Sequence, residues 1–138
     1  MSLKTKHLNV NTTYFVIFTC YNWLPLFEIT RLYDDIYRWF DKLTENGNYI
    51  LGYVIMPNHI HLLIRLGPQS KTINQIVSEG KRFRAYEIVK RLKNLQQHEL
   101  LIRLSGALTL KEKSKGSNHK IFIESFDCKE CFTSEFVQ

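Results

Sequence analysis

Residues 49–66, YILGYVIMPNHIHLLIRL, hold two apolar runs that are separated by a Pro-Asn pair. The runs 49–56 and 59–66 are rich in Ile, Leu, Val and Tyr, and each has the length of a β-strand. Proline and asparagine are turn residues, and so short a connection joins antiparallel neighbours. The stretch therefore predicts a β-hairpin.

Two helices and two further strands are expected on either side of this hairpin. Apolar residues at helical spacing predict helices over 29–46 and 71–94. Aromatic and β-branched residues predict strands over 12–22 and 119–126. The order is then β-α-β-β-α-β. This is the ferredoxin-like α+β plan, an antiparallel sheet with helices on one face.

Local signals add detail to these elements. The helix over 71–94 is expected to bury one apolar stripe, formed by Ile73, Ile76, Val77, Gly80 and Phe83. Helix starts are expected at a capping box formed by Thr72 and Gln75, at Asp127 with Glu130, and at Ser134. Gly47 is expected to end a helix in the left-handed conformation. A short helix is expected at 98–104 and a loop over 111–118.

The composition is that of one soluble globular domain spanning residues 1–138, with 44% hydrophobic and 23% charged residues. No apolar stretch reaches the length of a membrane span, and the N-terminus lacks the apolar core of a signal peptide. We therefore expect a cytoplasmic protein with no membrane partner. Three cysteines, an odd number, indicate no disulfide framework.

Most of the net charge of +6 lies in one short segment, residues 71–93, which carries seven Lys or Arg and two Glu. A basic patch of this kind is typical of a nucleic-acid surface, although a solvated helix face has the same composition. The residues expected to contact DNA phosphates are Lys81, Arg82, Arg84, Lys90 and Arg91. Arg84 falls near the apolar stripe, so a packed position is its alternative.

His59 and His61 are separated by one residue in a predicted strand, so both side chains point to the same face. Neutral imidazole is a common metal ligand, and two histidines about 7 Å apart along a strand can converge on one ion. Catalytic zinc takes a third protein ligand, which the sequence does not identify. A site with two histidines leaves room for water and phosphate oxygens and suits Mg²⁺ or Mn²⁺. The alternative is a pair of partly exposed histidines on an open sheet.

A resemblance to a known family adds to this interpretation. The segment GYVIMPNHIHLLI is similar to the His-hydrophobic-His (HUH) segment of single-tyrosine transposases, including the REP-associated ones. The similarity continues in YFVIFTCYNWLPLF before it, and in INQIVSEGKRFRAYEIVKRL and HKIFIESFDCKECF after it, over roughly residues 12–138. It implies a ferredoxin-like fold, a homodimer, and cleavage and rejoining of single-stranded hairpin DNA. The histidines would bind a divalent metal, and a tyrosine would form a 5′-phosphotyrosine link.

The family's nucleophilic tyrosine lies on a helix after the last strand, and the resemblance implies that residues 1–138 stop short of it. Tyr86 in the basic helix is expected to be a packing residue, and no nucleophile is assigned. A non-catalytic member of the family that binds DNA hairpins is therefore an alternative. An RNA-binding ferredoxin-like module that stacks bases on sheet aromatics is another.

Overall fold

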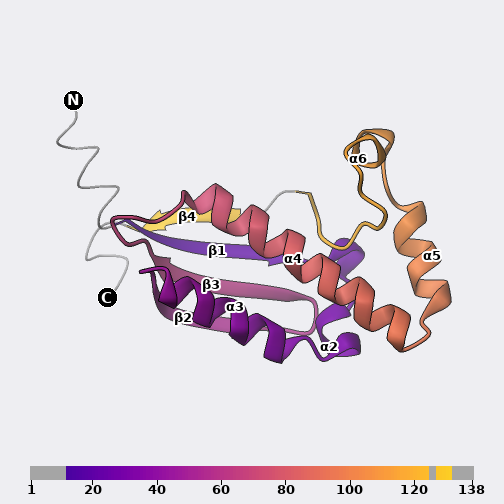
Figure 1. Cartoon of the computed structure of the whole chain (residues 1–138), viewed down its shortest axis with the longest axis horizontal. Helices are drawn as coiled ribbons and strands as arrows, with labels where there is room; N and C mark the ends of the chain where they lie inside the picture. The colour runs from indigo at the N-terminus through magenta and orange to yellow at the C-terminus, as the bar shows by residue number, and fades with distance from the viewer. Residues whose placement is uncertain (1–11, 125–126, 132–138) are drawn as a thin grey trace.

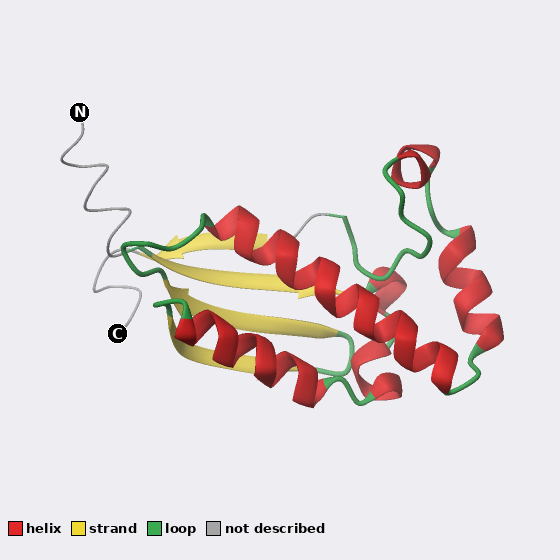
Figure 2. Ribbon diagram, viewed as in Figure 1, coloured by secondary structure: helices red, strands yellow, loops and turns green. Residues whose placement is uncertain are grey.

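A computed structural model of the chain describes residues 12–124 and 127–131. The four strands form one antiparallel sheet in the order β2-β3-β1-β4, and α3 and α4 lie across one of its faces (Figures 1 and 2). The predicted α+β, ferredoxin-like arrangement is confirmed. The elements in chain order are β1 (Thr13–Thr19), η1 (Tyr21–Trp23), α2 (Leu26–Thr30), α3 (Tyr33–Glu45), β2 (Tyr49–Ile55), β3 (His59–Arg65), α4 (Ile73–Asn94), α5 (His98–Gly106), α6 (Leu110–Ser114) and β4 (Asp127–Cys131).

The predicted hairpin is confirmed as β2 and β3, which pair antiparallel and are joined at residues 56–58. Along β3, Ile60, Leu62 and Ile64 are at most 1% exposed, whereas His59 and His61 between them are only half-buried. The alternation follows from the two-residue period of a strand, in which one face packs on the helices. The two histidines therefore lie on the face of the sheet opposite α3 and α4, the open face.

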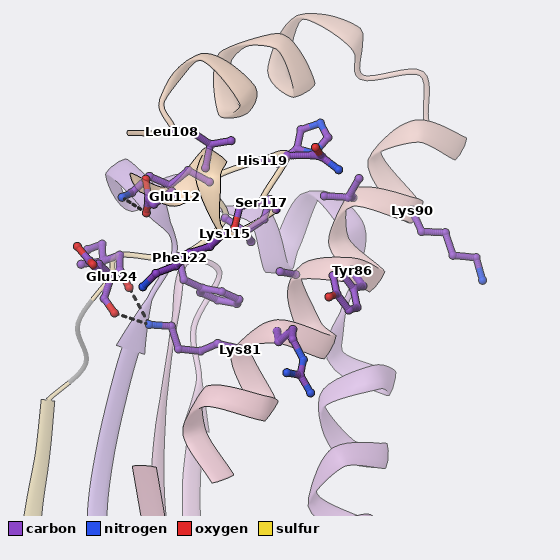
Figure 3. A pocket seen from close by; sticks show the side chains of 18 of the residues that line it. Lys81, Tyr86, Lys90, Leu108, Glu112, Lys115, Ser117, His119, Phe122 and Glu124 are labelled. Carbon is purple, nitrogen blue, oxygen red and sulfur yellow. Dashed lines mark hydrogen bonds and ion pairs between the residues drawn. The ribbon is translucent and has the colours of Figure 1, made fainter. Parts of the chain in front are cut away.

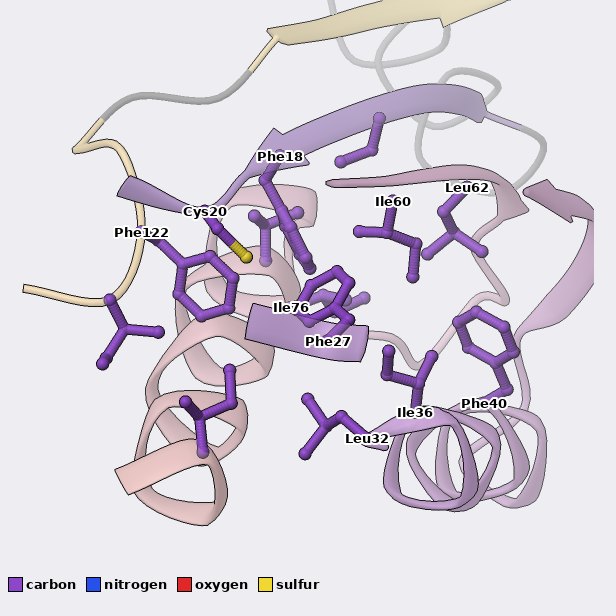
Figure 4. Packing of buried hydrophobic residues seen from close by; sticks show 14 of the residues in the cluster. Phe18, Cys20, Phe27, Leu32, Ile36, Phe40, Ile60, Leu62, Ile76 and Phe122 are labelled. Atoms are coloured by element: carbon purple, nitrogen blue, oxygen red, sulfur yellow. The ribbon is translucent and has the colours of Figure 1, made fainter. Parts of the chain in front are cut away.

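The hydrophobic core fills the space between the sheet and the helices (Figure 4). It joins Phe18, Ile60 and Leu62 of the sheet to Phe27, Ile36, Phe40 and Ile76 of the helices. Gly80 lets α4 approach α3 closely, because a Cβ at this position would overlap the indole ring of Trp39. Cys20 is fully buried, and this burial raises the pKa of its thiol to about 12.

Helix α4 begins at the predicted capping box, in which the backbone N–H of Gln75 donates to the Thr72 hydroxyl at 3.2 Å. The predicted apolar stripe is correct through Gly80 and wrong at the next turn. Phe83 is 48% exposed, and Arg84 takes the inward position instead. Asp35 of α3 faces this position and favours the guanidinium over an aromatic ring.

The helix predicted over 29–46 is broken into α2 and α3. Arg31 has a positive φ of 50°, which ends α2 in the left-handed conformation. The α2 carbonyls released there accept from Arg91 of α4, at 3.2 Å for Thr30 and 2.8 Å for Arg31. The predicted left-handed Gly47 is confirmed after α3, with a φ of 93°.

The last strand lies later in the chain than predicted. Residues 119–124 contain only an isolated bridge between Phe122 and Cys20, and β4 occupies Asp127–Cys131. Ile121 and Phe122 instead place their side chains in the core, while the carbonyls of 123 and 124 accept from Lys81. A helix start at Asp127 is therefore wrong, and Ser134 lies outside the described residues.

Two smaller elements complete the described chain. The short helix predicted at 98–104 is confirmed as α5. The expected loop over 111–118 begins with a short helix, α6, which Thr109 and Glu112 cap reciprocally. No helix among residues 12–124 and 127–131 has both the length and the apolarity that crossing a membrane requires.

Candidate functional site

His59 and His61 lie next to each other on the central strand β3, with ring centroids 4.9 Å apart and ring planes inclined by 59°. Across the ladder they pair with Thr19 and Ile17 of β1. Strand β3 is paired on both sides, so the backbone that carries the two imidazoles is held by hydrogen bonds along its length. The predicted common face of the two side chains is confirmed.

Two aromatic side chains flank the histidine pair. The Trp23 ring meets His59 edge-on at a centroid distance of 6.1 Å, and the Phe15 ring lies 5.7 Å from His61. Trp23 precedes α2 in a left-handed conformation, with a φ of 57°. Neither residue was predicted from the sequence. Phe15 could have been found by strand parity, but Trp23 reaches the site through a turn that periodicity does not describe.

The surroundings of His59 favour its neutral form. Burial lowers the pKa of His59 below its ordinary value, and the nearby His61 shifts it in the same direction. A neutral imidazole keeps the lone pair with which it can bind a metal. Within residues 12–124 and 127–131, no group of three or more His, Cys, Asp or Glu side chains gathers around an ion-sized position. The described part of the site therefore offers two nitrogen ligands.

The five residues predicted to contact DNA differ in their surroundings. Arg84 is 9% exposed, with its Nε 2.6 Å from Asp35 Oδ2 and its guanidinium 5.3 Å from the centroid of the Trp39 ring. Arg91 is bound to the α2 carbonyls, to Asp34 and to Glu87. These two guanidinium groups are already bound to carboxylate or carbonyl oxygens of the protein.

Lys81 also makes contacts within the protein. Its Nζ donates to the carbonyls of Ile123 at 2.8 Å and Glu124 at 3.1 Å, as Figure 3 shows. Burial lowers the pKa of this ammonium group. Lys81 thus holds the segment 119–124 against α4. Of the five predicted contacts, Arg82 and Lys90 are the ones exposed to solvent.

A groove of about 680 Å³ lies between α4 and the segment from α6 to Glu124 (Figure 3). Its basic lining residues are Lys81, Arg82, Lys90, Lys93, Lys115, His119 and Lys120, and its acidic ones are Glu112 and Glu124. Lys120 is paired with Glu112 at 2.8 Å. Burial and the positive charge of Lys93 lower the pKa of His119. Even with His119 neutral, the groove is a cationic surface, because its Lys and Arg side chains outnumber its two Glu side chains.

Tyr86 lies in this groove and is 63% exposed. The prediction that it is a packing residue is wrong, because α4 turns this position toward the groove rather than toward the sheet. The second wall, with Lys115 and His119, was also missed. The only signal was the lysine-rich run 111–120, and sequence gives no indication that it folds back onto α4.

A family model described as "Transposase IS200 like" matches residues 10–103. The chain belongs to the IS200-like transposase family. The matched range contains the hairpin, the histidine pair and all of α4, and it favours a transposase over the RNA-binding module considered from the sequence. A search of curated proteins gave no match.

Solved structures with a similar fold include a transposase. The structure described as "REP associates tyrosine transposase bound to a REP hairpin" has a TM-score of 0.50 and 16% sequence identity, with 91% of this chain and 59% of that chain covered. The IS200-like chain thus spans about three fifths of that protein. A second solved structure, of a Deinococcus radiodurans R1 protein, gives a TM-score of 0.45 at 13% identity, with 92% of this chain and 84% of that chain covered. At these identities the similarity concerns the fold.

Proposed function

We propose that this IS200-like transposase acts on single-stranded hairpin DNA by metal-assisted phosphodiester cleavage, and transfers strands through a phosphotyrosine intermediate. The observation that carries the proposal is the adjacent pair of imidazoles on the open face of the sheet. Its HUH spacing and the family membership support the same chemistry.

His59 and His61 would hold one divalent cation, Mg²⁺ or Mn²⁺. Such a cation, when bound, polarises a phosphoryl oxygen and stabilises the charge that develops there. The donor set fits, since two neutral imidazoles leave positions for the water and phosphate oxygens that these cations prefer. The protein presents both imidazoles from a doubly paired strand, and the rings of Trp23 and Phe15 flank them.

In the proposed reaction a tyrosine hydroxyl attacks the phosphorus and forms a 5′-phosphotyrosine bond. The bond from the phosphorus to the 3′-oxygen of the preceding nucleotide of the same strand breaks, and the phenol proton passes through water to that oxygen, which leaves as a 3′-hydroxyl. This conserves the bond energy for rejoining, so no external energy source is needed. Tyr86 is not assigned this role. It lies in a helix that covers the face of the sheet opposite the histidines.

The cationic groove is proposed to bind the DNA backbone. Arg82, Lys90, Lys93 and Lys115 line it, and exposed cations of this kind attract phosphates strongly at low salt. Tyr86 between them offers a ring for an unpaired base. The REP-associated transposase with a similar fold was solved bound to a REP hairpin, which supports a hairpin as the ligand.

A homodimer is also proposed. The aromatic-rich strand predicted over 12–22 would be a natural place for the contact between subunits, but β1 lies inside the sheet between β3 and β4. That placement is wrong. The edge strand β2 is the better surface, since Leu51, Tyr53 and Val54 are each about half exposed along it.

The experiment that tests the active site is Mn²⁺ titration by calorimetry. His59→Ala and His61→Ala should each weaken Mn²⁺ binding, because each removes one of two protein ligands. His98→Ala is the matched control, since His98 is exposed on α5 and far along the chain from β3. Equal Mn²⁺ binding by the wild type and both single variants at β3 would remove the proposed metal site.

A further inference from the structure

The side chain of Asn58 connects the turn before β3 to the first histidine. Its Nδ2 donates to the backbone carbonyl of Trp23 at 3.2 Å, and its Oδ1 lies 2.7 Å from Nδ1 of His59. Asn58 is half-buried, and its own carbonyl accepts from the N–H of Cys20 at 2.8 Å. The residue is thus held from three directions at the end of the open face.

These contacts determine which way the amide points. A backbone carbonyl can only accept a hydrogen bond, so the group facing Trp23 must be the amide nitrogen. The amide oxygen therefore faces His59. Since that oxygen can only accept, the ring nitrogen opposite it must carry the proton. In neutral His59 the proton then lies on Nδ1, and Nε2 keeps the free lone pair.

The position of the Trp23 carbonyl is itself fixed by the fold. Asn22 and Trp23 have φ angles of 54° and 57°, a left-handed conformation that is uncommon for an aromatic residue. Such a conformation persists where surrounding contacts determine it. Here the N–H of Phe27 donates to the carbonyl of Pro57 at 3.0 Å, which ties the start of α2 to the same turn.

We propose that Asn58 is a positioning residue, which fixes His59 as the Nδ1–H tautomer and reserves Nε2 for a divalent cation. The consequence for metal binding rests on the proposed function of the histidine pair, whereas the tautomer does not. Groups that hold the second nitrogen of a metal-binding histidine typically change metal affinity by about 10- to 100-fold. The asparagine of the Pro-Asn turn thus has a role beyond forming the turn.

The first test is NMR of the full 138-residue chain with ¹⁵N-labelled histidine, without metal, at about pH 8, above the ordinary His pKa of about 6.5. The His59 signals should show a protonated Nδ1 and an unprotonated Nε2. Asn58→Ala should lose this preference. Asn58→Asp should keep it, because a carboxylate oxygen still accepts from Nδ1 although the side chain no longer donates to the Trp23 carbonyl. An Nε2–H tautomer in the wild type, or no change in Asn58→Ala, would overturn the proposal.

His61 is an internal control, because its tautomer should be the same in all three proteins. Backbone amide signals of β1 and β3 that stay in place show that the Asn58→Ala sheet is folded. Widespread changes of signals in Asn58→Ala would show that this variant is misfolded, and the test would then rest on Asn58→Asp. If Asn58→Asp lost the Nδ1–H form while its His61 signals stayed in place, the argument from the acceptor oxygen would be wrong.

The second test is Mn²⁺ calorimetry on the same variants. Asn58→Ala should bind Mn²⁺ about 10- to 100-fold more weakly than the wild type. Asn74→Ala is the matched control, since it makes the same change at an exposed position of α4, which covers the other face of the sheet. A wild type with the Nδ1–H tautomer but no Mn²⁺ binding would contradict the proposed metal function and leave the positioning role intact. Full Mn²⁺ affinity in a folded Asn58→Ala would contradict the role in metal binding.

Discussion

At the scale of single residues, Arg84 shows how a position that looks like a DNA contact can serve the fold. Its side chain and that of Asp35 are 11% and 12% exposed, and they form an ion pair between α4 and α3. The Trp39 ring covers the guanidinium. Burial lowers the pKa of Arg84, which reflects the cost of removing a charge from water. Each charge of the pair therefore depends on its partner.

Replacing Arg84 by Ala should destabilise the protein by up to about 3–5 kcal/mol, because the buried Asp35 would lose its buried partner and keep only the exposed Arg38, which lies 3.3 Å from its Oδ1. The free energy of unfolding from urea titration measures this. Arg82→Ala, two residues away on the exposed side of α4, should change the free energy of unfolding by less than about 0.5 kcal/mol. Similar small losses in both variants would show that the buried pair contributes little.

At the scale of elements, the edge strand β2 has the features of a contact surface. Its outer edge carries no strand partner among the described residues, and its exposed side chains are mostly apolar or aromatic. An uncovered strand of this kind readily pairs with another chain. Strand β1 cannot play this part, since both of its edges are already paired.

Leu51→Lys should therefore shift the proposed dimer toward monomer, because a charge would be placed at the proposed pairing edge. Sedimentation at several protein concentrations measures the change. Lys42→Glu, an exposed change of charge in the last turn of α3, should leave the dimer intact. A wild type that is monomeric at tens of micromolar, of the order of usual assay concentrations, would contradict the proposed dimer.

The α2–α3 junction should lose stability in acid. The hydrogen bond from Arg91 lowers the pKa of Asp34 to about 2 from its usual 3.8. A lowered folded-state pKa means that this stabilisation is complete above the unfolded value and is lost as the pH falls toward 2. Asp34→Asn should reduce the dependence of the unfolding free energy on pH between about 4 and 2. An unchanged pH dependence would show that solvent screens this exposed carboxylate completely.

At the scale of the whole molecule, the sheet separates two candidate functional surfaces. The histidine pair lies on the open face, and the cationic groove lies beside α4 on the helix face. Under the proposed function, DNA bound in the groove must pass around an edge or an end of the sheet to reach the histidines. The affinity for DNA and the affinity for the metal should therefore respond to different substitutions.

Arg82→Ala and Lys115→Ala should each weaken binding of a DNA hairpin. Each should also lower the slope of log K against log salt by about one, as expected when one phosphate contact is lost. Fluorescence anisotropy at several salt concentrations measures both quantities. Lys42→Ala, which removes an exposed cation from α3, is the matched control. Equal effects of all three variants would mean that net charge acts rather than the groove.

Tyr86→Leu should weaken the same binding by about 1–3 kcal/mol if a base stacks on the ring, and Tyr86→Phe should not. Neither variant should alter any covalent protein–DNA product on a denaturing gel, because Tyr86 lies on the face away from the histidines. A covalent product that disappears in Tyr86→Phe would identify Tyr86 as the nucleophile.

The features that the sequence predicted correctly all depend on short-range periodicity. The hairpin, the capping box at Thr72 and the shared face of His59 and His61 require only the two-residue period of a strand or the geometry of one helical turn. The order of elements also restricts the topology enough to predict the antiparallel sheet. For the candidate site, the sequence by itself determined the histidine pair and the basic helix.

The tertiary structure decided what depends on contacts between distant segments. Arg84 is buried because Asp35 lies opposite it on another helix. Tyr86 is exposed because α4 turns it into an open groove, whose far wall is formed by residues 115–124. The last strand lies at 127–131 rather than at the predicted 119–126, because Ile121 and Phe122 place their side chains in the core. Asn58 orients His59 only because a left-handed turn brings the Trp23 carbonyl within reach. Local periodicity carries no information about such pairings, since they depend on how the packed elements meet in space.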